Sequence, residues 1–416
     1  MKSNLVELFF RKFSQMQPLI PNVTRYFSLA FFSTSYSQGF KFFLAECPLL
    51  IRVLPFNFDQ NEGRLTSPRR RKVDKIVFWA SYAVIIVYTV FFLWKILGRL
   101  GNYEGTSISI STPEEEGEHQ TIMFLGTLSC CFFFYDTTLL LPGETAAVSA
   151  MITETFEIEA DLMTRTAGSP PHVETIMRIL LAMLFASRTN LPLIMALLSI
   201  IMPQFGLSSL FPAANFETHL STLLKTMLVI VEGWFWWSGC CSVLFTNMIG
   251  YMVPVMVIKA ILDQELGENG SNFCSLKTKY QRYRGLQIFV NVFNSCWESP
   301  FILIFLLGWT IVITHSLFVL IHYHEKIGIL TLMVFANLTI YGIIVIGMLH
   351  IFAAPYKMSR EVVREWGRMG GNKKILRSCA PLKVKIGRVN FFDKFTSLLV
   401  LQFCVTGVVN LQVGIG

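Results

Sequence analysis

The sequence predicts an all-α, polytopic membrane protein with seven transmembrane helices, the N-terminus inside and the C-terminus outside. Of its 416 residues, 53% are hydrophobic and 15% are charged, and the mean hydropathy is +0.52. A soluble protein of this length would need more charge to cover its surface. The 37 phenylalanines also exceed what a water-soluble core usually holds. We therefore expect much of the apolar surface to face lipid.

A helix needs about 20 largely apolar residues to cross the hydrocarbon of a bilayer. Seven stretches meet this requirement: Ile76–Leu97, Gln120–Pro142, Ile176–Met202, Leu223–Val257, Ser299–Ile321, Ile327–Phe352 and Lys394–Gly416. The fourth is longer than a bilayer requires, so we expect its helix to continue into water. Phe27–Leu44 is also rich in aromatic residues, but Ser33, Gln38 and Lys41 interrupt it. We predict that it lies at the membrane interface.

The distribution of Lys and Arg predicts the orientation, because short basic loops stay on the cytoplasmic side. Twelve lie at or before Lys75, five follow the fourth span before the fifth, and 11 lie between Lys357 and Lys394. The opposite loops contain the acidic "TPEEEGE" and the uncharged run "QFGLSSLFPAANF". We therefore predict a cytoplasmic region over residues 1–75, helices one to six over 76–352, a cytoplasmic anchor segment over 353–393 and a seventh helix over 394–416.

The sequence contains no motif that predicts catalysis. Walker, HExxH and GxSxG patterns are missing, and His322 and His324 are better interpreted as a solvated pair than as metal ligands. The nine cysteines lack zinc-site spacing, and several lie within apolar runs, where thiols behave as small hydrophobic groups. We expect no enzymatic activity, cofactor, metal or nucleic-acid partner.

Two charged residues inside predicted spans are candidates for a ligand site, because charges within the bilayer are costly and commonly functional. Arg188 lies near the middle of the third span, and Glu232 lies in the outer half of the fourth. A pair between them would satisfy both charges. Such a pair could be a structural tie or a polar wall of a ligand pocket, and the sequence leaves both open.

Aromatic and polar residues near Glu232 extend this candidate site. Trp234, Trp236 and Trp237 form either an interfacial aromatic belt or flat surfaces for a small organic ligand. Thr314 and His315, in the outer half of the fifth span, are candidates of the same kind.

The basic segment after the sixth span contains an amphipathic pattern. Val362, Trp366 and Met369 recur at helical spacing, which predicts a short helix over Ser359–Met369. This helix could rest on anionic lipid or form a subunit contact beneath the membrane.

The last span carries amide and hydroxyl groups that need partners in hydrocarbon. Three of them are spaced four apart and stack on one face: Gln402, Thr406 and Asn410. Val409 and Val413 lie at the edges of this face, whereas Gln412 points roughly 160° away from Asn410. The polar face could line water or meet its own copies around a symmetry axis. It could also bond to neighbouring helices within one subunit.

These features together resemble the arthropod chemoreceptor superfamily of gustatory and odorant receptors. The local match is to the gustatory signature in the last helix: Thr-Tyr, five apolar residues and Gln-Phe. Here it reads "TGVVNLQV", with Gly407 in place of Tyr, a spacer one residue shorter and Val413 in place of Phe. The preceding "NFFDKFTSLL" looks like the family's approach to that helix, with Asp393 in the acidic position.

The resemblance implies a tetrameric, ligand-gated, non-selective cation channel in the plasma membrane, more gustatory than odorant. It implies a small-molecule ligand in the outer half of the helical bundle, lipid contacts and related receptor subunits as partners. It also implies that Gln412 lines the pore, with Val409 and Val413 near a hydrophobic gate. Helical geometry instead groups Thr406 and Asn410 with those valines. We follow the geometry for Val409, Asn410 and Val413.

Two other classes remain as alternatives. A G-protein-coupled receptor would have its N-terminus outside, contrary to the predicted orientation, and the predicted outer loops lack the cysteines of its usual outer disulfide. A secondary transporter commonly has an internal repeat, which is not visible here.

Overall fold

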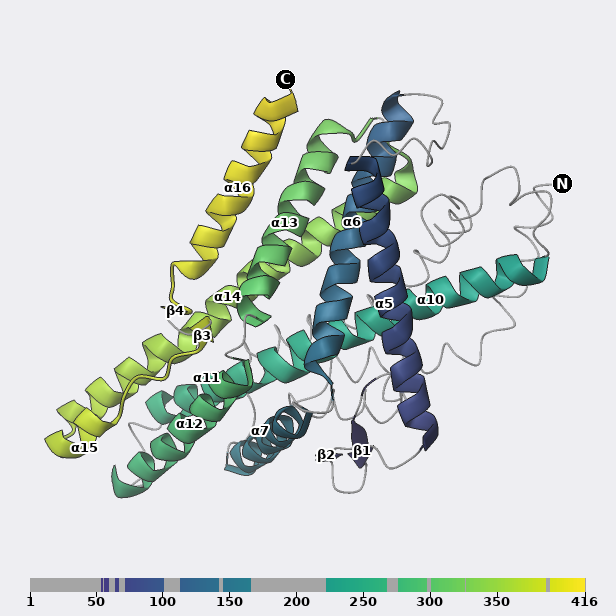
Figure 1. Ribbon diagram of the computed structural model, residues 1–416. Helices are drawn as coiled ribbons and strands as arrows, with labels where there is room; N and C mark the ends of the chain where they lie inside the picture. The colour runs from purple at the N-terminus through teal and green to yellow at the C-terminus, as the bar shows by residue number, and fades with distance from the viewer. Residues whose placement is uncertain are drawn as a thin grey trace, which may run out of the picture.

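Long helices make up most of the described chain in this computed structural model (Figure 1). The structure describes residues 54, 56–59, 64–66, 72–100, 113–141, 145–165, 222–267, 276–297, 301–325, 327–386 and 390–415. The predicted third span and the interfacial stretch Phe27–Leu44 lie outside these residues. The count of seven spans and their orientation therefore stay predictions.

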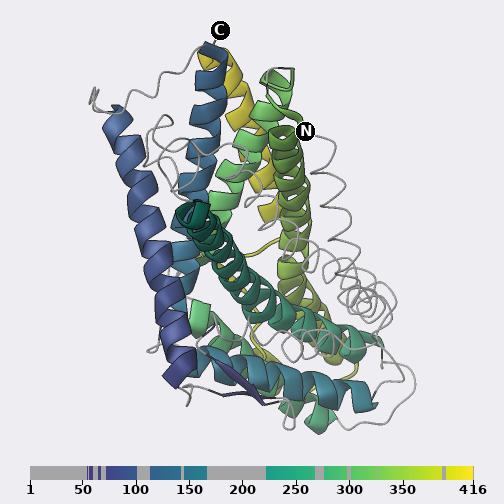
Figure 2. The ribbon, with the colours of Figure 1, turned by 90° about the vertical axis from the view of Figure 1, so that its right-hand side faces the viewer.

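The first described unit combines two long helices with a helix laid across their lower ends. Helix α5 (Lys72–Leu100) packs along α6 (Pro113–Leu139), which match the first two predicted spans. Figure 2 shows α7 (Thr145–Arg165) lying across the end of this pair. The antiparallel strands β1 (Asn57–Asp59) and β2 (Arg64–Thr66) lie against α7.

The sequence analysis did not predict α7. Its buried residues recur at helical spacing, among them Val148, Ile152 and Phe156. Acidic residues between them lower the mean hydropathy, so a search for 20 apolar residues misses the helix. Residues of this kind form an amphipathic helix that packs through one face.

A single long helical path runs through the middle of the molecule. It consists of α10 (Thr222–Leu244), the π-helical segment η4 (Phe245–Met252) and α11 (Val253–Gly267). The stretch Thr226–Gly267 is 42 residues long, with 94% of its most apolar window buried. The expectation that the fourth span continues beyond the bilayer length is confirmed by this length.

The next two elements correct the predicted loop after the fourth span. That region contains α11 and the 22-residue helix α12 (Leu276–Trp297), which precedes α13 (Phe301–His322). Tyr283, Leu286 and Phe293 of α12 are buried at helical spacing. Basic residues on the other faces conceal this pattern from a hydropathy search.

Helix α14 corrects both the end of the sixth span and the separate helix predicted over Ser359–Met369. It runs unbroken from Ile329 to Arg368, 40 residues, with Pro355 inside it. Proline removes one helical N–H donor, which usually kinks or ends a helix, yet packing on both sides of Pro355 keeps this helix continuous. Gly370, with φ of 81°, ends it, because glycine adopts left-handed backbone conformations without steric cost.

The lower end of α14 packs within the chain. Val362 and Trp366 are each 1% exposed, and the Trp366 ring lies edge-on to Tyr280 and Tyr283 of α12 at centroid distances of 5.2 and 5.5 Å. Met369 is 42% exposed. The apolar face expected to rest on lipid or another subunit is therefore covered by α12.

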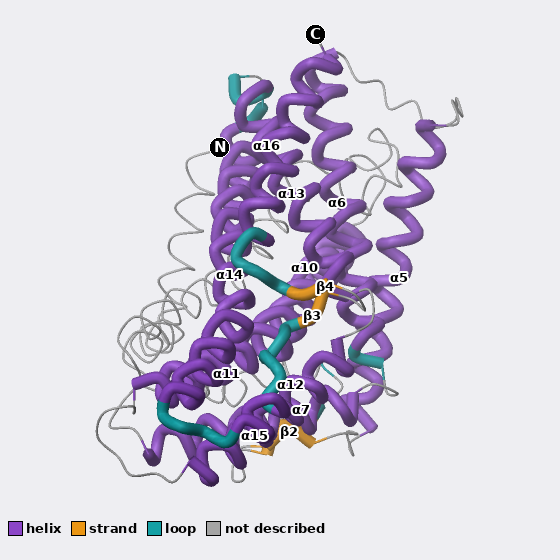
Figure 3. The backbone as a smooth tube through the Cα atoms, turned by 90° about the vertical axis from the view of Figure 1, so that its left-hand side faces the viewer, coloured by secondary structure: helices purple, strands orange, loops and turns teal. Residues whose placement is uncertain are grey.

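The segment after α14 returns along the surface to the last helix (Figure 3). It contains α15 (Lys373–Ser378), strands β3 (Lys385–Ile386) and β4 (Asn390–Phe391), and then α16 (Thr396–Ile415). Asn294 of α12 holds it at two points: Nδ2 donates to the Lys383 carbonyl at 2.8 Å, and Oδ1 accepts from the Lys385 amide at 2.9 Å. The Ser359 hydroxyl of α14 accepts from the Leu382 amide at 3.0 Å.

Within the described residues, five helices are long and apolar enough to cross a membrane: Lys72–Trp94, Thr226–Gly267, Ile302–His322, Thr331–Arg368 and Thr396–Val413. They correspond to predicted spans one, four, five, six and seven. Helix α6 covers the second predicted span.

Candidate functional site

Helix α16 is attached to the rest of the chain along one face. Cys404 and Val408 are buried on that face, toward α13 and α14. The Thr314 hydroxyl of α13 lies 3.5 Å from the Cys404 carbonyl oxygen, to which it donates. Gly407 allows this close approach, because a Cβ there would lie 2.8 Å from a Thr314 methyl group. Glycine thus replaces the signature tyrosine where the two helices meet.

The opposite face of α16 is uncovered in the single chain (Figure 1). Six residues singled out from the sequence are exposed: Gln402, Thr406, Val409, Asn410, Gln412 and Val413. At 100° per residue, Gln402, Thr406 and Val413 lie almost opposite Cys404 and Val408. Asn410 lies toward one side of this face and Gln412 toward the other. The structure leaves all six free of the bundle, and their role in a pore stays a prediction.

The beginning of α16 is fixed by the residue in the family's acidic position. Asp393 Oδ1 accepts from the Phe395 amide at 3.0 Å and from the Thr396 hydroxyl at 2.9 Å. The Thr396 hydroxyl oxygen also accepts from the Asp393 amide at 3.1 Å. These bonds satisfy groups that the first turn of a helix leaves without helical partners.

Glu232 lies in a buried polar contact between α10 and α5. Its side chain is 5% exposed, and Oε2 accepts from the Tyr88 hydroxyl at 2.9 Å. The Tyr88 ring stacks on Phe235 at a centroid distance of 4.1 Å. Arg188, the predicted partner of Glu232, lies outside the described residues. Tyr88 was missed from the sequence, although a hydroxyl in an otherwise apolar span is a usable signal.

The three tryptophans of α10 lie in the interior of the bundle. Trp236 is 4% exposed and packs edge-on to Phe133 at 5.5 Å. Trp234 Nε1 donates to the Ser81 hydroxyl of α5 at 3.1 Å, and Trp237 is partly buried against the main core. These contacts disagree with an interfacial belt. They place Glu232 and Trp234 together at the α5–α10 contact.

Thr314 and His315 are neighbours in sequence but contact different helices. Thr314 contacts α16, as described above, whereas the His315 ring lies 4.7 Å from the Phe124 ring of α6 and 6.1 Å from the Phe335 ring of α14. Helix α13 thus touches α16 on one side and α6 and α14 on the other. His315 and Glu232 contact different partners, so the structure does not unite the six ligand-site candidates in one described cluster.

A carboxyl group in the second predicted span was also missed from the sequence. Asp136 of α6 is 2% exposed, and its Oδ1 accepts from the Thr246 hydroxyl at 3.1 Å. Thr246 belongs to η4, and π-helical turns of this kind are frequent at functional sites. Acidic residues inside predicted spans are the signal that would have found it.

The cysteine and metal expectations concern only the described part of the chain. Its seven cysteines are free thiols, and burial raises the pKa of the Cys379 thiol near α15. This shift keeps Cys379 protonated at neutral pH, as expected for a small buried hydrophobic group. No group of three or more potential metal ligands occurs among those residues.

Comparison with known proteins identifies the fold. No protein-family model and no curated protein sequence matches this chain. Among solved structures, it is similar to the insect olfactory receptor OR5 from Machilis hrabei in complex with eugenol, with a TM-score of 0.57 and 11% sequence identity. The match covers 89% of this chain and 98% of the receptor chain. The two chains share a fold along almost their whole lengths.

Proposed function

We propose that the chain is one subunit of a ligand-gated, non-selective cation channel in the plasma membrane, a chemosensory receptor for small organic molecules. Its fold is similar to that of an insect olfactory receptor in complex with eugenol. The gustatory-type signature at Thr406–Val413 favours a taste receptor. The structural comparison favours an odorant receptor equally.

The observation that carries this proposal is the uncovered polar face of α16. Gln402, Thr406 and Asn410 are exposed on a helix whose apolar residues, including Leu399 and Phe403, are also exposed. A polar face in lipid is costly. Four copies of α16 around an axis would direct this face at water and leave the apolar flanks for lipid and neighbouring subunits.

The helix contacts support a route from ligand to pore. A small molecule among α5, α6 and α10 would alter the position of α6, whose Phe124 touches His315 of α13. The next residue, Thr314, contacts the α16 backbone at Cys404. Movement of α13 would therefore displace α16, separate a ring of Val413 and open the pore to ions near Asn410.

Subunit contacts beneath the membrane would hold the tetramer together. Lys373, Lys374 and Arg377 of α15 are exposed at the lower end of the molecule, within the proposed anchor segment. Contacts of these side chains with a neighbouring subunit or with anionic lipid headgroups complete the proposed assembly.

Currents from Asn410 variants test the pore assignment. Whole-cell recordings would use cells that express the chain, with G-protein signalling blocked and a panel of tastants and odorants applied. Asn410→Leu should lower the ligand-evoked cation current at unchanged surface expression, because it removes an amide from the pore wall. Phe403→Leu, on an exposed apolar position of the same helix, is the matched control and should leave the current unchanged. Equal currents in both variants would argue against a pore role for this face.

A further inference from the structure

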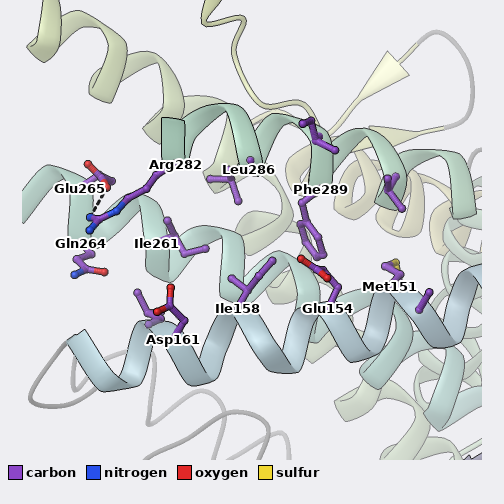
Figure 4. Close-up of a pocket in the computed structure, with 15 residues that line it drawn as sticks. Met151, Glu154, Ile158, Asp161, Ile261, Gln264, Glu265, Arg282, Leu286 and Phe289 are labelled. Atoms are coloured by element: carbon purple, nitrogen blue, oxygen red, sulfur yellow. Dashed lines mark hydrogen bonds and ion pairs between the residues drawn. The ribbon is translucent and has the colours of Figure 1, made fainter. Parts of the chain in front are cut away.

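A cavity lies between α7, α11 and α12, near the end of the molecule that carries α15 (Figures 1 and 4). Its volume is about 530 Å³, within the range of roughly 300–1,000 Å³ that is typical of small-molecule sites. None of its lining residues belongs to the proposed pore or to the candidate ligand site around Glu232. Its occupant would therefore differ from the ligand that gates the channel.

The lining joins an apolar floor to an acidic rim. Ile158, Ile261 and Phe289 supply apolar surface from all three helices. The charged lining residues are Glu154, Asp161, Glu265 and Arg282. Arg282 pairs with Glu265 at 3.5 Å, so these two charges offset each other. The rim keeps the negative charges of Glu154 and Asp161, which selects for a cation.

The spacing of the two carboxylates defines the shape of that cation. Glu154 and Asp161 are seven residues apart on α7, which places them on one face about 10.5 Å apart along the axis. Ile158 lies between them on the same face, and Figure 4 shows all three side chains on the side of α7 that faces α11 and α12. Glu154 makes no hydrogen bond or ion pair with the described residues. The pattern is a carboxylate, an apolar surface and a second carboxylate.

We propose that this cavity binds a linear alkyl diamine. One ammonium group would pair with Glu154 and the other with Asp161, while the hydrocarbon chain lies across Ile158 and beneath Phe289. The two carboxylates reward a cation at each end, and the apolar floor rewards the methylene groups between them. A monoamine would gain only one of the two ion pairs.

Gly285 of α12 keeps the cavity open. A Cβ at this position would meet no heavy atom within 4 Å, although Gly285 lines the cavity. A larger side chain there would enter the space intended for the diamine. It would also raise local helix propensity, because glycine is a poor helix former.

Titration calorimetry on the purified full-length chain tests the site without any need for channel currents. We expect 1,8-diaminooctane to bind more tightly than 1-aminooctane, which lacks the second charge, and than 1,4-diaminobutane, which is too short to reach both carboxylates. Glu154→Gln should weaken the binding of 1,8-diaminooctane about fivefold, as expected for loss of a partly exposed ion pair. Glu157→Gln removes the same charge from α7 at a position outside the cavity lining, where Glu157 pairs with Arg64 at 2.8 Å, and should leave binding unchanged.

Gly285→Leu provides a second, steric test. It should abolish binding, whereas Gly347→Leu on α14, where an added Cβ also meets no heavy atom within 4 Å, should not. Thermal unfolding of both variants checks that each is folded. The proposal is overturned if the wild-type chain does not bind 1,8-diaminooctane, if 1-aminooctane binds equally well, or if folded Gly285→Leu binds normally. Each of these results leaves the proposed pore untouched, because the Asn410 recordings test it separately.

Discussion

At the scale of single residues, buried polar contacts tie the outer helices to the long central one. Tyr88 of α5 donates to Glu232, and the Ser81 hydroxyl of α5 accepts from Trp234. A buried carboxylate is costly unless hydrogen bonds replace its lost hydration. These contacts therefore fix which face of α5 packs on α10.

Removing the Tyr88 hydroxyl should destabilise the protein through Glu232. We expect Tyr88→Phe to lower the free energy of unfolding by about 1–3 kcal/mol, the cost of depriving a buried group of a donor. Thermal unfolding of the purified protein measures the effect. Tyr82→Phe is the matched control, because the Tyr82 hydroxyl lies 3.3 Å from the Thr138 hydroxyl at a partly exposed site. An equal effect of both substitutions would contradict the importance of the Glu232 contact.

At the scale of helices, the lower part of α14 is held by aromatic packing against α12. Trp366 is among the largest fully buried side chains and lies edge-on to two tyrosines. Such ring pairs contribute about 0.5–1.5 kcal/mol beyond the burial of apolar area. This packing explains why the helix continues beyond Pro355.

Truncation of Trp366 tests this explanation. Trp366→Ala should cost about 3–5 kcal/mol, because it leaves a large cavity between α14 and α12. Met369→Ala, three residues further along at an exposed position, should change stability by less than about 0.5 kcal/mol. Chemical unfolding in detergent compares the two variants. Similar stabilities would mean that the lower end of α14 does not pack on α12 as described.

The elements that could be predicted from the sequence are those whose signal is local. Runs of apolar residues located α5, α6, α13 and α16, because membrane hydrocarbon imposes length and composition on each helix separately. Helices α7 and α12 were missed because their charged faces lower the mean hydropathy. The extent of α14 was missed because its lower half is stabilised by α12, a partner distant in sequence.

The candidate site divides in the same way. The exposed face of α16 follows from helical spacing alone, so Gln402, Thr406 and Val413 were identified correctly as one side of the helix. The grouping of Glu232 and Trp234 with α5 depends on Tyr88 and Ser81, which lie about 150 positions earlier in the chain. Contacts at that separation are set by the tertiary fold, and one sequence does not reveal them.

At the scale of the whole molecule, the central and terminal helices differ sharply in burial. The most apolar window of Thr226–Gly267 is 94% buried within the chain, whereas that of Thr396–Val413 is only 22% buried. A helix that carries amide and hydroxyl groups and has little contact with its own bundle is suited to an axis shared with other copies. The fold, similar to that of an insect olfactory receptor, gives this arrangement a precedent.

The most direct test of the central claim is single-channel recording from the purified chain in planar lipid bilayers, with no G protein present. Addition of an activating ligand should evoke unitary cation currents, and Asn410→Leu should reduce their amplitude while Phe403→Leu leaves it unchanged. Ligand binding without unitary currents, or unitary currents of the same amplitude in wild type and Asn410→Leu, would contradict the assignment of α16 as the pore helix.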